Sequence, residues 1–215
     1  MKLSDFVLST VILTVGVCIY NDMHKLPEPT KVSTFSYETV SDMPEQTEAD
    51  IEPFEIKNPD GVFEVDPLYN YKMTAMVMSR YNYDWEWDGR LVPVDLALAW
   101  GDLTKPELMS EVSYSQSGRW YYYRYSGKFP RDPSYIITHS ANNHLVPASQ
   151  NIREALQKVQ THQIVHLEGY LINISGNVGG RKITWTTSQT RNDSGDHSCE
   201  LFYVNKLVIG KNIYI

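Results

Sequence analysis

The chain has 215 residues, and its 19 Lys and Arg against 26 Asp and Glu give a formal charge of −7 at pH 7. This length suggests one domain with appendages and is sufficient to bury a sizeable core. A hydrophobic fraction of 42% and a charged fraction of 21% exclude a wholly disordered chain, a coiled coil and a polytopic membrane protein. The acidic balance also argues against a nucleic-acid-binding protein, so we expect no nucleic acid among its partners.

The first 26 residues contain an apolar run that is typical of a membrane anchor. Residues 6–20 read FVLSTVILTVGVCIY and carry no charge, and counting from Leu3 gives about 18 residues, which just suffices for a thin bilayer. No small-residue cleavage site follows, which favours an uncleaved signal-anchor over a cleaved signal peptide. We therefore expect residues 1–26 to hold a single transmembrane segment over residues 3–20, with the C-terminal domain outside the cytoplasm.

Residues 27–70 are acidic and rich in proline. They hold eleven acidic and two basic residues, and six of the eleven prolines of the chain. Low apolar content with like charges does not offset the entropy of ordering, so we expect a largely disordered tether. An interaction segment for a basic partner is the alternative. Apolar residues near its end, from Phe54 to Val65, are able to pair with the edge of a sheet, so the last dozen residues can be ordered.

Residues 71–215 are nearly neutral, and most of their patterns are typical of strands. Alternation predicts strands at residues 71–79, 111–116, 119–126 and 135–139, with a tight turn at Ser117 and Gly118. Residues 91–100 read LVPVDLALAW, which suits a strand or a short helix.

One helix is expected after residue 150, where Asn151 and Glu154 form a capping-box pattern. A strand with a bulge at Gly169 is predicted over residues 164–174, and strands at 181–189 and 199–209 follow turns at 177–180 and 192–196. The fold class expected for residues 71–215 is therefore α+β and predominantly β. The order of elements predicts a small, partly closed antiparallel barrel with one main helix, compatible with an OB-like barrel, beside the N-terminal transmembrane helix.

Several blocks of the sequence resemble an uncharacterised family of bacterial membrane-anchored or exported single-domain proteins. These blocks are DLALAWG, SYSQSGRWYYYRY, HSANNHLVPASQNIREAL, VHLEGYL and WTTSQTRNDSGDHSCELFYV. The resemblance covers roughly residues 71–210, and it implies a bacterial inner-membrane protein with one periplasmic domain. It carries no known activity, so it assigns no catalytic residue.

Aromatic residues are the most distinctive candidates for a binding surface. In YNYDWEWDGR, aromatic residues alternate with polar ones, and in RWYYYRY a second alternating set follows. If both segments are strands, each has a continuous aromatic face, which is common in carbohydrate- and peptide-binding surfaces. A buried aromatic core is the competing interpretation. The candidate binding residues are Tyr83, Trp85, Trp87, Trp120, Tyr122 and Arg124.

The histidines suggest an alternative, a metal- or carboxylate-dependent hydrolase of the cell envelope. Its candidate catalytic or metal-binding residues are His139, His144, Asp193, Asp196 and His197. No pair among them has a recognised metal-ligand spacing with a second matching pair, so we expect no metal and no cofactor. Residues 191–196 suit a tight turn better than a Ca²⁺ loop.

Cys199 is the only cysteine after residue 71. Because an apolar run follows it, we expect this side chain to pack in the core, and a Cys–His nucleophile with His197 is the less favoured reading. Taken together, the sequence favours a non-catalytic binding or assembly module whose partner is an envelope protein or a glycan, with the envelope enzyme as the alternative.

Overall fold

The computed structural model describes residues 24–37, 40, 43–191, 195 and 198–215. The expected membrane segment, residues 3–20, lies outside these residues. Within the described part of the chain, no helix has the length and apolar character needed to cross a bilayer.

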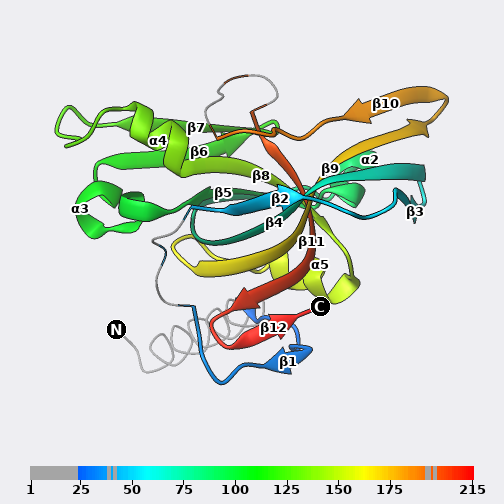
Figure 1. Ribbon diagram of the computed structural model, residues 1–215, viewed down its shortest axis with the longest axis horizontal. Coiled ribbons are helices and arrows are strands. Elements are labelled where there is room, and N and C mark those ends of the chain that lie inside the picture. The colour runs from blue at the N-terminus through cyan, green and yellow to red at the C-terminus, as the bar shows by residue number, and fades with distance from the viewer. Residues whose placement is uncertain (1–23, 38–39, 41–42, 192–194, 196–197) are drawn as a thin grey trace, which may run out of the picture.

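Strands dominate the described residues, and the helices are short (Figure 1). The strands are β1 (Lys31–Val32), β2 (Glu45–Glu48), β3 (Phe54–Asn58), β4 (Gly61–Asn82), β5 (Val94–Ala99), β6 (Val112–Ser117), β7 (Trp120–Tyr125), β8 (Ser140–Pro147), β9 (Ile164–Val178), β10 (Arg181–Trp185), β11 (Glu200–Ile209) and β12 (Asn212–Tyr214). The helices are α2 (Glu86–Leu91), the 3₁₀ turn η1 (Gly101–Thr104), α3 (Pro106–Met109), α4 (Ser134–His139) and α5 (Gln150–Leu156). The expected predominance of β structure is confirmed.

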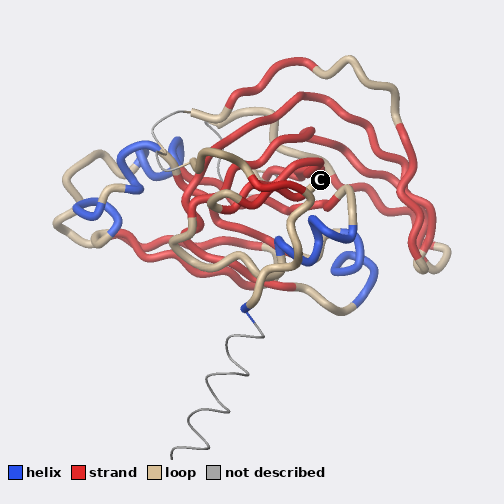
Figure 2. Tube along the Cα trace, turned by 90° about the horizontal axis from the view of Figure 1, so that it is seen from below, coloured by secondary structure: helices blue, strands red, loops and turns tan. Residues whose placement is uncertain are grey.

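Five strands pair in a cyclic order, which makes a partial ring of hydrogen bonds. β4 pairs with β5, β5 with β8, β8 with β11, β11 with β9, and β9 again with β4. β8 and β11 run parallel, whereas the other pairs are antiparallel, so the sheet is mixed rather than antiparallel as predicted. Seen from below, the strands curve around the core instead of forming a flat layer (Figure 2).

The two faces of β5 are both buried, but they differ in chemistry. Val94, Leu96 and Leu98 point into the main hydrophobic core. Because side chains alternate along a strand, Asp95 and Ala97 lie on the opposite face, and they are buried as well. This second face is covered by the β6–β7 hairpin, whose Arg119 and Gln116 reach residues of β5 and β8.

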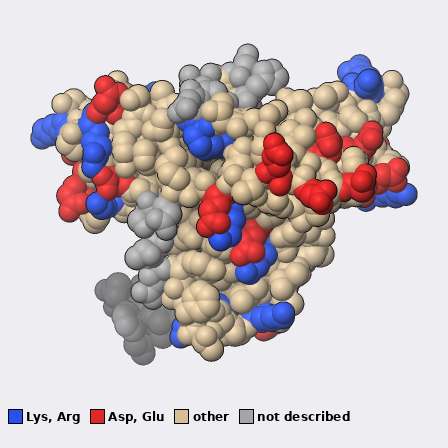
Figure 3. Space-filling view, viewed as in Figure 1, with Lys and Arg blue, Asp and Glu red and all other residues tan. Residues whose placement is uncertain are grey.

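The sheet begins well inside the segment that was predicted to be a disordered tether. Strands β1 to β3 and the first ten residues of β4 all lie within residues 27–70, and β4 runs through the predicted domain boundary at residue 71. In β4, Phe63 and Val65 are buried while Glu64 and Asp66 are exposed. The alternation is therefore that of a strand, and the acidic residues occupy its solvent-facing positions. On the face shown in Figure 3, acidic side chains gather over β3 and β4.

Residues 134–139, which include a predicted strand, are helical, and so are residues 86–91, for which a strand was one interpretation. Residues 86–91 form α2 because the chain turns at Glu86, which has a left-handed φ of 61°, so the aromatic alternation of this segment does not lie on a strand. Residues 134–139 form α4, where the Asp132 side chain accepts a hydrogen bond from the Ser134 N–H at 2.8 Å.

The predicted hairpin and the predicted main helix are both present, with shifted boundaries. Gly118 and Arg119 form the turn between β6 and β7, one residue later than expected, and both have left-handed φ values. Ser149, not Asn151, caps α5, because its hydroxyl accepts from the Ile152 N–H at 3.2 Å.

Gly169 lies where β9 and β11 approach each other most closely. The bulge itself is on β11, between Val204 and Lys206, opposite Gly169. A Cβ atom at residue 169 would lie 1.9 Å from the Tyr203 carbonyl oxygen, and the φ of 156° also disfavours a side chain. The ring therefore requires glycine at this position.

We expect Gly169→Ala to lower the free energy of unfolding by about 2–4 kcal/mol, since the added methyl group meets backbone that is unable to yield. Urea denaturation followed by tryptophan fluorescence measures this loss. Gly127→Ala is the matched control, because a Cβ at Gly127 meets nothing within 4 Å and its φ is not left-handed. Equal stability of the two variants would contradict the assignment of this close approach.

Candidate functional site: a cleft above a buried carboxylate

A cleft of about 720 Å³ opens where α2, the β6–β7 turn, β8 and β10 meet. In Figure 1, β6 and β7 lie at the upper left of the molecule, and the β9–β10 hairpin extends to the upper right. The cleft is lined by Glu86, Trp87, Asp88, Arg119, Trp120, His144, Lys182, Ile183, Thr184, Trp185, Thr186, Gly195 and Cys199. Its walls thus combine three indole rings with charged groups and one thiol.

The Asp95 carboxylate lies beneath this cleft and has no exposed surface. Asp95 and His144 are direct cross-strand partners in the β5–β8 pair. The Nδ1 atom of His144 lies 2.9 Å from Oδ1 of Asp95, and Arg119 donates to the same oxygen at 2.9 Å. One buried oxygen therefore holds two cationic partners, which is how a protein keeps a charge inside its core.

Arg119 enters this arrangement from the tight turn between β6 and β7. Its guanidinium also donates to the Asp88 carboxylate at 2.9 Å and to the Val92 carbonyl at 3.0 Å, and it lies 3.4 Å from the centre of the Tyr83 ring. Its backbone N–H donates to the Tyr83 hydroxyl at 2.9 Å. These contacts fasten the hairpin turn to α2 and β5.

The environment of His144 favours its charged form. Burial by itself lowers the pKa of this imidazole, but the charge of Asp95 and hydrogen bonds to Asp95 and Cys199 together raise the pKa to about 9. His144 therefore carries a proton at neutral pH although only 4% of its surface is exposed.

Cys199 is half-buried and lies in the wall of the cleft, directly before β11. The side-chain amide of Asn142 donates to its Sγ atom at 3.6 Å. The thiol is therefore not packed in the hydrophobic core, as the sequence suggested. Its histidine neighbour is His144 on the adjacent strand, whereas His197 is outside the described residues.

The predicted binding residues lie in different parts of the structure. Trp87 and Trp120 line the cleft, and Tyr83 lies under the Arg119 guanidinium. Tyr122 lines a neighbouring cavity of about 320 Å³, which also contains Trp120 and Cys199. Trp85 is 82% exposed and Arg124 is also exposed, and neither lines these cavities.

Sequence reasoning missed Asp88, Asp95, Arg119, Lys182 and Trp185 as members of the site. Only Asp95 had a signal in the sequence. It is the one acid in the otherwise apolar run LVPVDLALAW, and a buried aspartate needs a partner. The identity of that partner depends on strand register.

The two described histidines of the hydrolase alternative, His139 and His144, do not come together. His139 ends α4 and stacks on Tyr135 with ring centres 3.7 Å apart, whereas His144 lies five residues further along an extended chain, roughly 15 Å away. Asp193, Asp196 and His197 lie outside the described residues. Within the described part of the chain, no three His, Cys, Asp or Glu side chains are placed to hold a metal ion.

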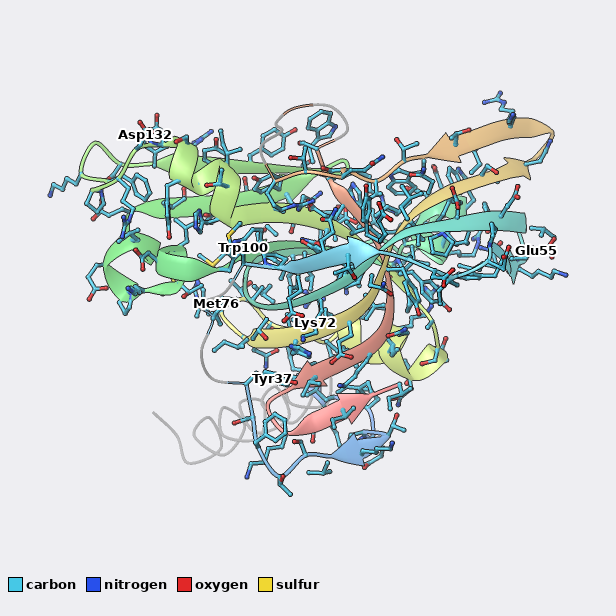
Figure 4. All side chains as sticks on the ribbon, viewed as in Figure 1. Tyr37, Glu55, Lys72, Met76, Trp100 and Asp132 are labelled. Carbon is cyan, nitrogen blue, oxygen red and sulfur yellow. The ribbon has the colours of Figure 1, made fainter. Side chains whose placement is uncertain are left out.

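A second polar cluster lies on the opposite part of the sheet, around Glu168. Its carboxylate contacts His166 Nε2 at 2.9 Å and Lys206 Nζ at 2.8 Å, and Tyr37 stacks on the His166 ring with centres 3.9 Å apart. Figure 4 shows Tyr37 and Lys72 in this region. Thr74 completes the set by contacting His166 Nδ1 at 2.8 Å. These groups satisfy one another, so the cluster has the character of a structural network.

Comparison of the chain with protein-family models, with curated proteins and with solved structures finds no match. The resemblance to bacterial exported proteins therefore stays a prediction, and the function must be argued from the geometry of the cleft.

The raised pKa of His144 predicts a dependence of stability on pH. Because the folded-state pKa is about 9 and the unfolded value is near 6.5, the stabilisation is present below about pH 6.5 and is lost as pH rises through 9. The loss amounts to about 3 kcal/mol. Unfolding free energies measured by urea denaturation between pH 6 and 10 should show this decline in the native chain and lack it in His144→Gln. Parallel pH profiles of the two proteins would refute the assignment.

Proposed function

We propose that the domain is a binding module with an OB-like, partly closed barrel, and that its cleft takes an extended segment of another polypeptide. The order of strands in the ring supports the barrel, because the third and fifth strands (β8 and β11) are the parallel pair and α5 lies between the third and fourth. In OB-folds, the second and third strands with the loops after the first and fourth strands form the ligand surface. Here the third ring strand (β8) and the segments after the first and fourth strands line the cleft, together with the β6–β7 turn.

The observation that carries the proposal is the open edge of β10. Among the described residues, β10 pairs with β9 alone. Five consecutive residues, 182–186, line the cleft. Since side chains alternate between the two faces of a strand, a consecutive run of this kind means that the edge of the strand faces the cleft. An edge strand with unpaired N–H and C=O groups is a template for a further strand.

The register of the β9–β10 hairpin identifies the free backbone groups. Gly179 and Gly180 form a two-residue turn, so the flanking pair Val178 and Arg181 exchanges hydrogen bonds. Every second residue after Arg181 repeats this pattern. The N–H and C=O groups of Lys182 and Thr184 are thereby directed to the open edge.

The rest of the cleft suits a polypeptide with apolar side chains. The positive charge of Arg119 is already matched by Asp88 and Asp95, so the centre of the cleft lacks the excess of cations that a polyanion needs. Trp120, 42% exposed, offers an aromatic surface opposite β10. A glycan would use the same rings, but its hydroxyl groups lack the regular spacing of N–H and C=O groups that matches a strand edge, which favours the peptide.

The location proposed for this module is the periplasmic side of the bacterial inner membrane. The support for it is the uncharged run at residues 6–20, whose apolar character suits a single membrane-spanning segment. A partner would then be another envelope protein.

Peptide selection by phage display on the full chain in detergent micelles tests the proposal. We expect selected peptides to bind Thr184→Pro at least about tenfold more weakly than the native chain, since proline removes one outward N–H while the hydrogen bonds to β9 remain. Thr184→Val keeps the N–H and should bind with unchanged affinity. Fluorescence polarisation of a labelled peptide measures both.

A second pair of variants tests the aromatic wall. Trp120→Ala should weaken peptide binding, whereas Trp85→Ala removes an exposed indole outside the cleft and should not. Equal binding by Thr184→Pro and Thr184→Val would contradict strand addition at β10. Selected peptides whose affinity is unchanged by both Thr184→Pro and Trp120→Ala would contradict it as well.

A further inference from the structure

We propose that the cavity beside the cleft, at the start of β8 and β11, binds a free α-amino acid with an apolar side chain, whose carboxylate pairs with Arg191 and whose ammonium group pairs with Glu200. This cavity is the one of about 320 Å³ that Tyr122 lines. The inference concerns a different site from the open edge of β10 and does not depend on the binding of a peptide there.

Two charged side chains lie in the wall of this cavity. Arg191 and Glu200 form an ion pair through Nη1 and Oε1, and only 15% of the first side chain and 1% of the second are exposed. Because side chains alternate along a strand, Glu200 lies on the same face of β11 as Phe202 and Val204, which belong to the main hydrophobic core. The ion pair therefore stands at the end of this core, where an unpaired polar atom is costly.

Each member of the ion pair uses only part of its hydrogen-bonding capacity. Among the described residues, eleven buried side-chain nitrogen and oxygen atoms lack a hydrogen-bond partner, and three of them are Nε and Nη2 of Arg191 and Oε2 of Glu200. A fourth is Oδ1 of Asn143, which pairs with Glu200 in the parallel β8–β11 ladder, so the two side chains lie on the same face. Four unpaired atoms gathered at one place indicate that a ligand completes the set.

The chemistry of the unpaired atoms defines the ligand. Nε and Nη2 form one edge of the guanidinium group, which donates two parallel hydrogen bonds to a carboxylate. Oε2 of Glu200 and Oδ1 of Asn143 are acceptors, and an ammonium group satisfies them because it carries three N–H donors. An anion alone would be repelled by the Glu200 carboxylate and a cation alone by Arg191, so a molecule that carries both charges matches the pair.

The remaining wall of the cavity suits an apolar side chain. Residues 120–123, which read WYYY, line it together with Ile137. Its volume of about 320 Å³ far exceeds the ~30 Å³ that one water molecule takes in the liquid, and it lies within the range of small-ligand sites. Arg191 is the more exposed member of the ion pair and has a flexible side chain, so a rotation of its guanidinium turns the unused edge toward the cavity.

Isothermal titration calorimetry of the full chain in detergent micelles tests the inference with L-leucine and L-phenylalanine as probes. We expect at least one of them to bind saturably at one site per chain. The N-acetyl derivative of that amino acid lacks the ammonium group and its methyl ester lacks the carboxylate, so each should bind at least about tenfold more weakly. Absence of binding by both amino acids, or equal binding of the blocked derivatives, would overturn the inference.

Substitutions locate the site. Arg191→Gln and Glu200→Gln should each weaken the binding of the amino acid at least about tenfold, because each removes one of the two charges. The matched controls Arg181→Gln and Glu48→Gln remove exposed charges outside the cavity and should bind as the native chain does. Unchanged binding by Arg191→Gln would contradict the assignment.

Two features keep these outcomes distinct from folding and from the peptide proposal. The comparison of the free amino acid with its blocked derivatives uses the native chain, so it is decisive even if Glu200→Gln does not fold. Thr184→Pro, which removes an outward N–H of β10, should leave the binding of the amino acid unchanged. A loss of amino-acid binding in Thr184→Pro equal to that in Arg191→Gln would overturn the placement of the ligand in this cavity.

Discussion

The buried carboxylate of Asp95 is the constraint on which the upper part of this molecule depends. A lone charge in a protein interior costs several kcal/mol, so the fold has to supply counter-charges at a fixed place. His144 arrives through the pairing of β5 with β8, and Arg119 arrives from a turn whose two residues both have left-handed φ. The need to neutralise one oxygen thus fixes where the β6–β7 hairpin sits against the sheet, and with it the shape of the cleft.

The side chains of β5 alternate between the hydrophobic core and the floor of the cleft, so the same strand contributes to stability and to the site. One face of the strand supplies Leu96 and Leu98 to the main core, and the opposite face supplies Asp95 to the floor of the cleft. Around that floor, α2 brings Trp87 and Asp88, and the β9–β10 hairpin brings Trp185 and an unpaired strand edge. The proposed peptide-binding function therefore rests on a base that the core of the sheet holds in place.

The sequence predicts those parts of the fold that local signals determine. Paired glycines before β10 and the polar start of α5 mark a hairpin turn and the beginning of a helix within two residues of their observed positions. The alternation of buried and exposed side chains in β4 was not recognised from the sequence, because its exposed positions are acidic and its segment is rich in proline. The site itself was hardly predictable, since Asp95, Arg119, His144 and Cys199 are brought together by strand register and by the docking of a hairpin. Of these four, only His144 was among the predicted site residues.

A double-mutant cycle between Asp95 and Arg119 tests the central claim most directly. The free energy of unfolding is measured for the native chain, Asp95→Asn, Arg119→Met and the double variant. If one buried charge requires the other, each single substitution costs about 3 kcal/mol or more, and the double variant is more stable than the sum predicts by about 2 kcal/mol. Additive losses within about 0.5 kcal/mol would show that the two groups act independently, and would contradict the view that Asp95 organises the cleft.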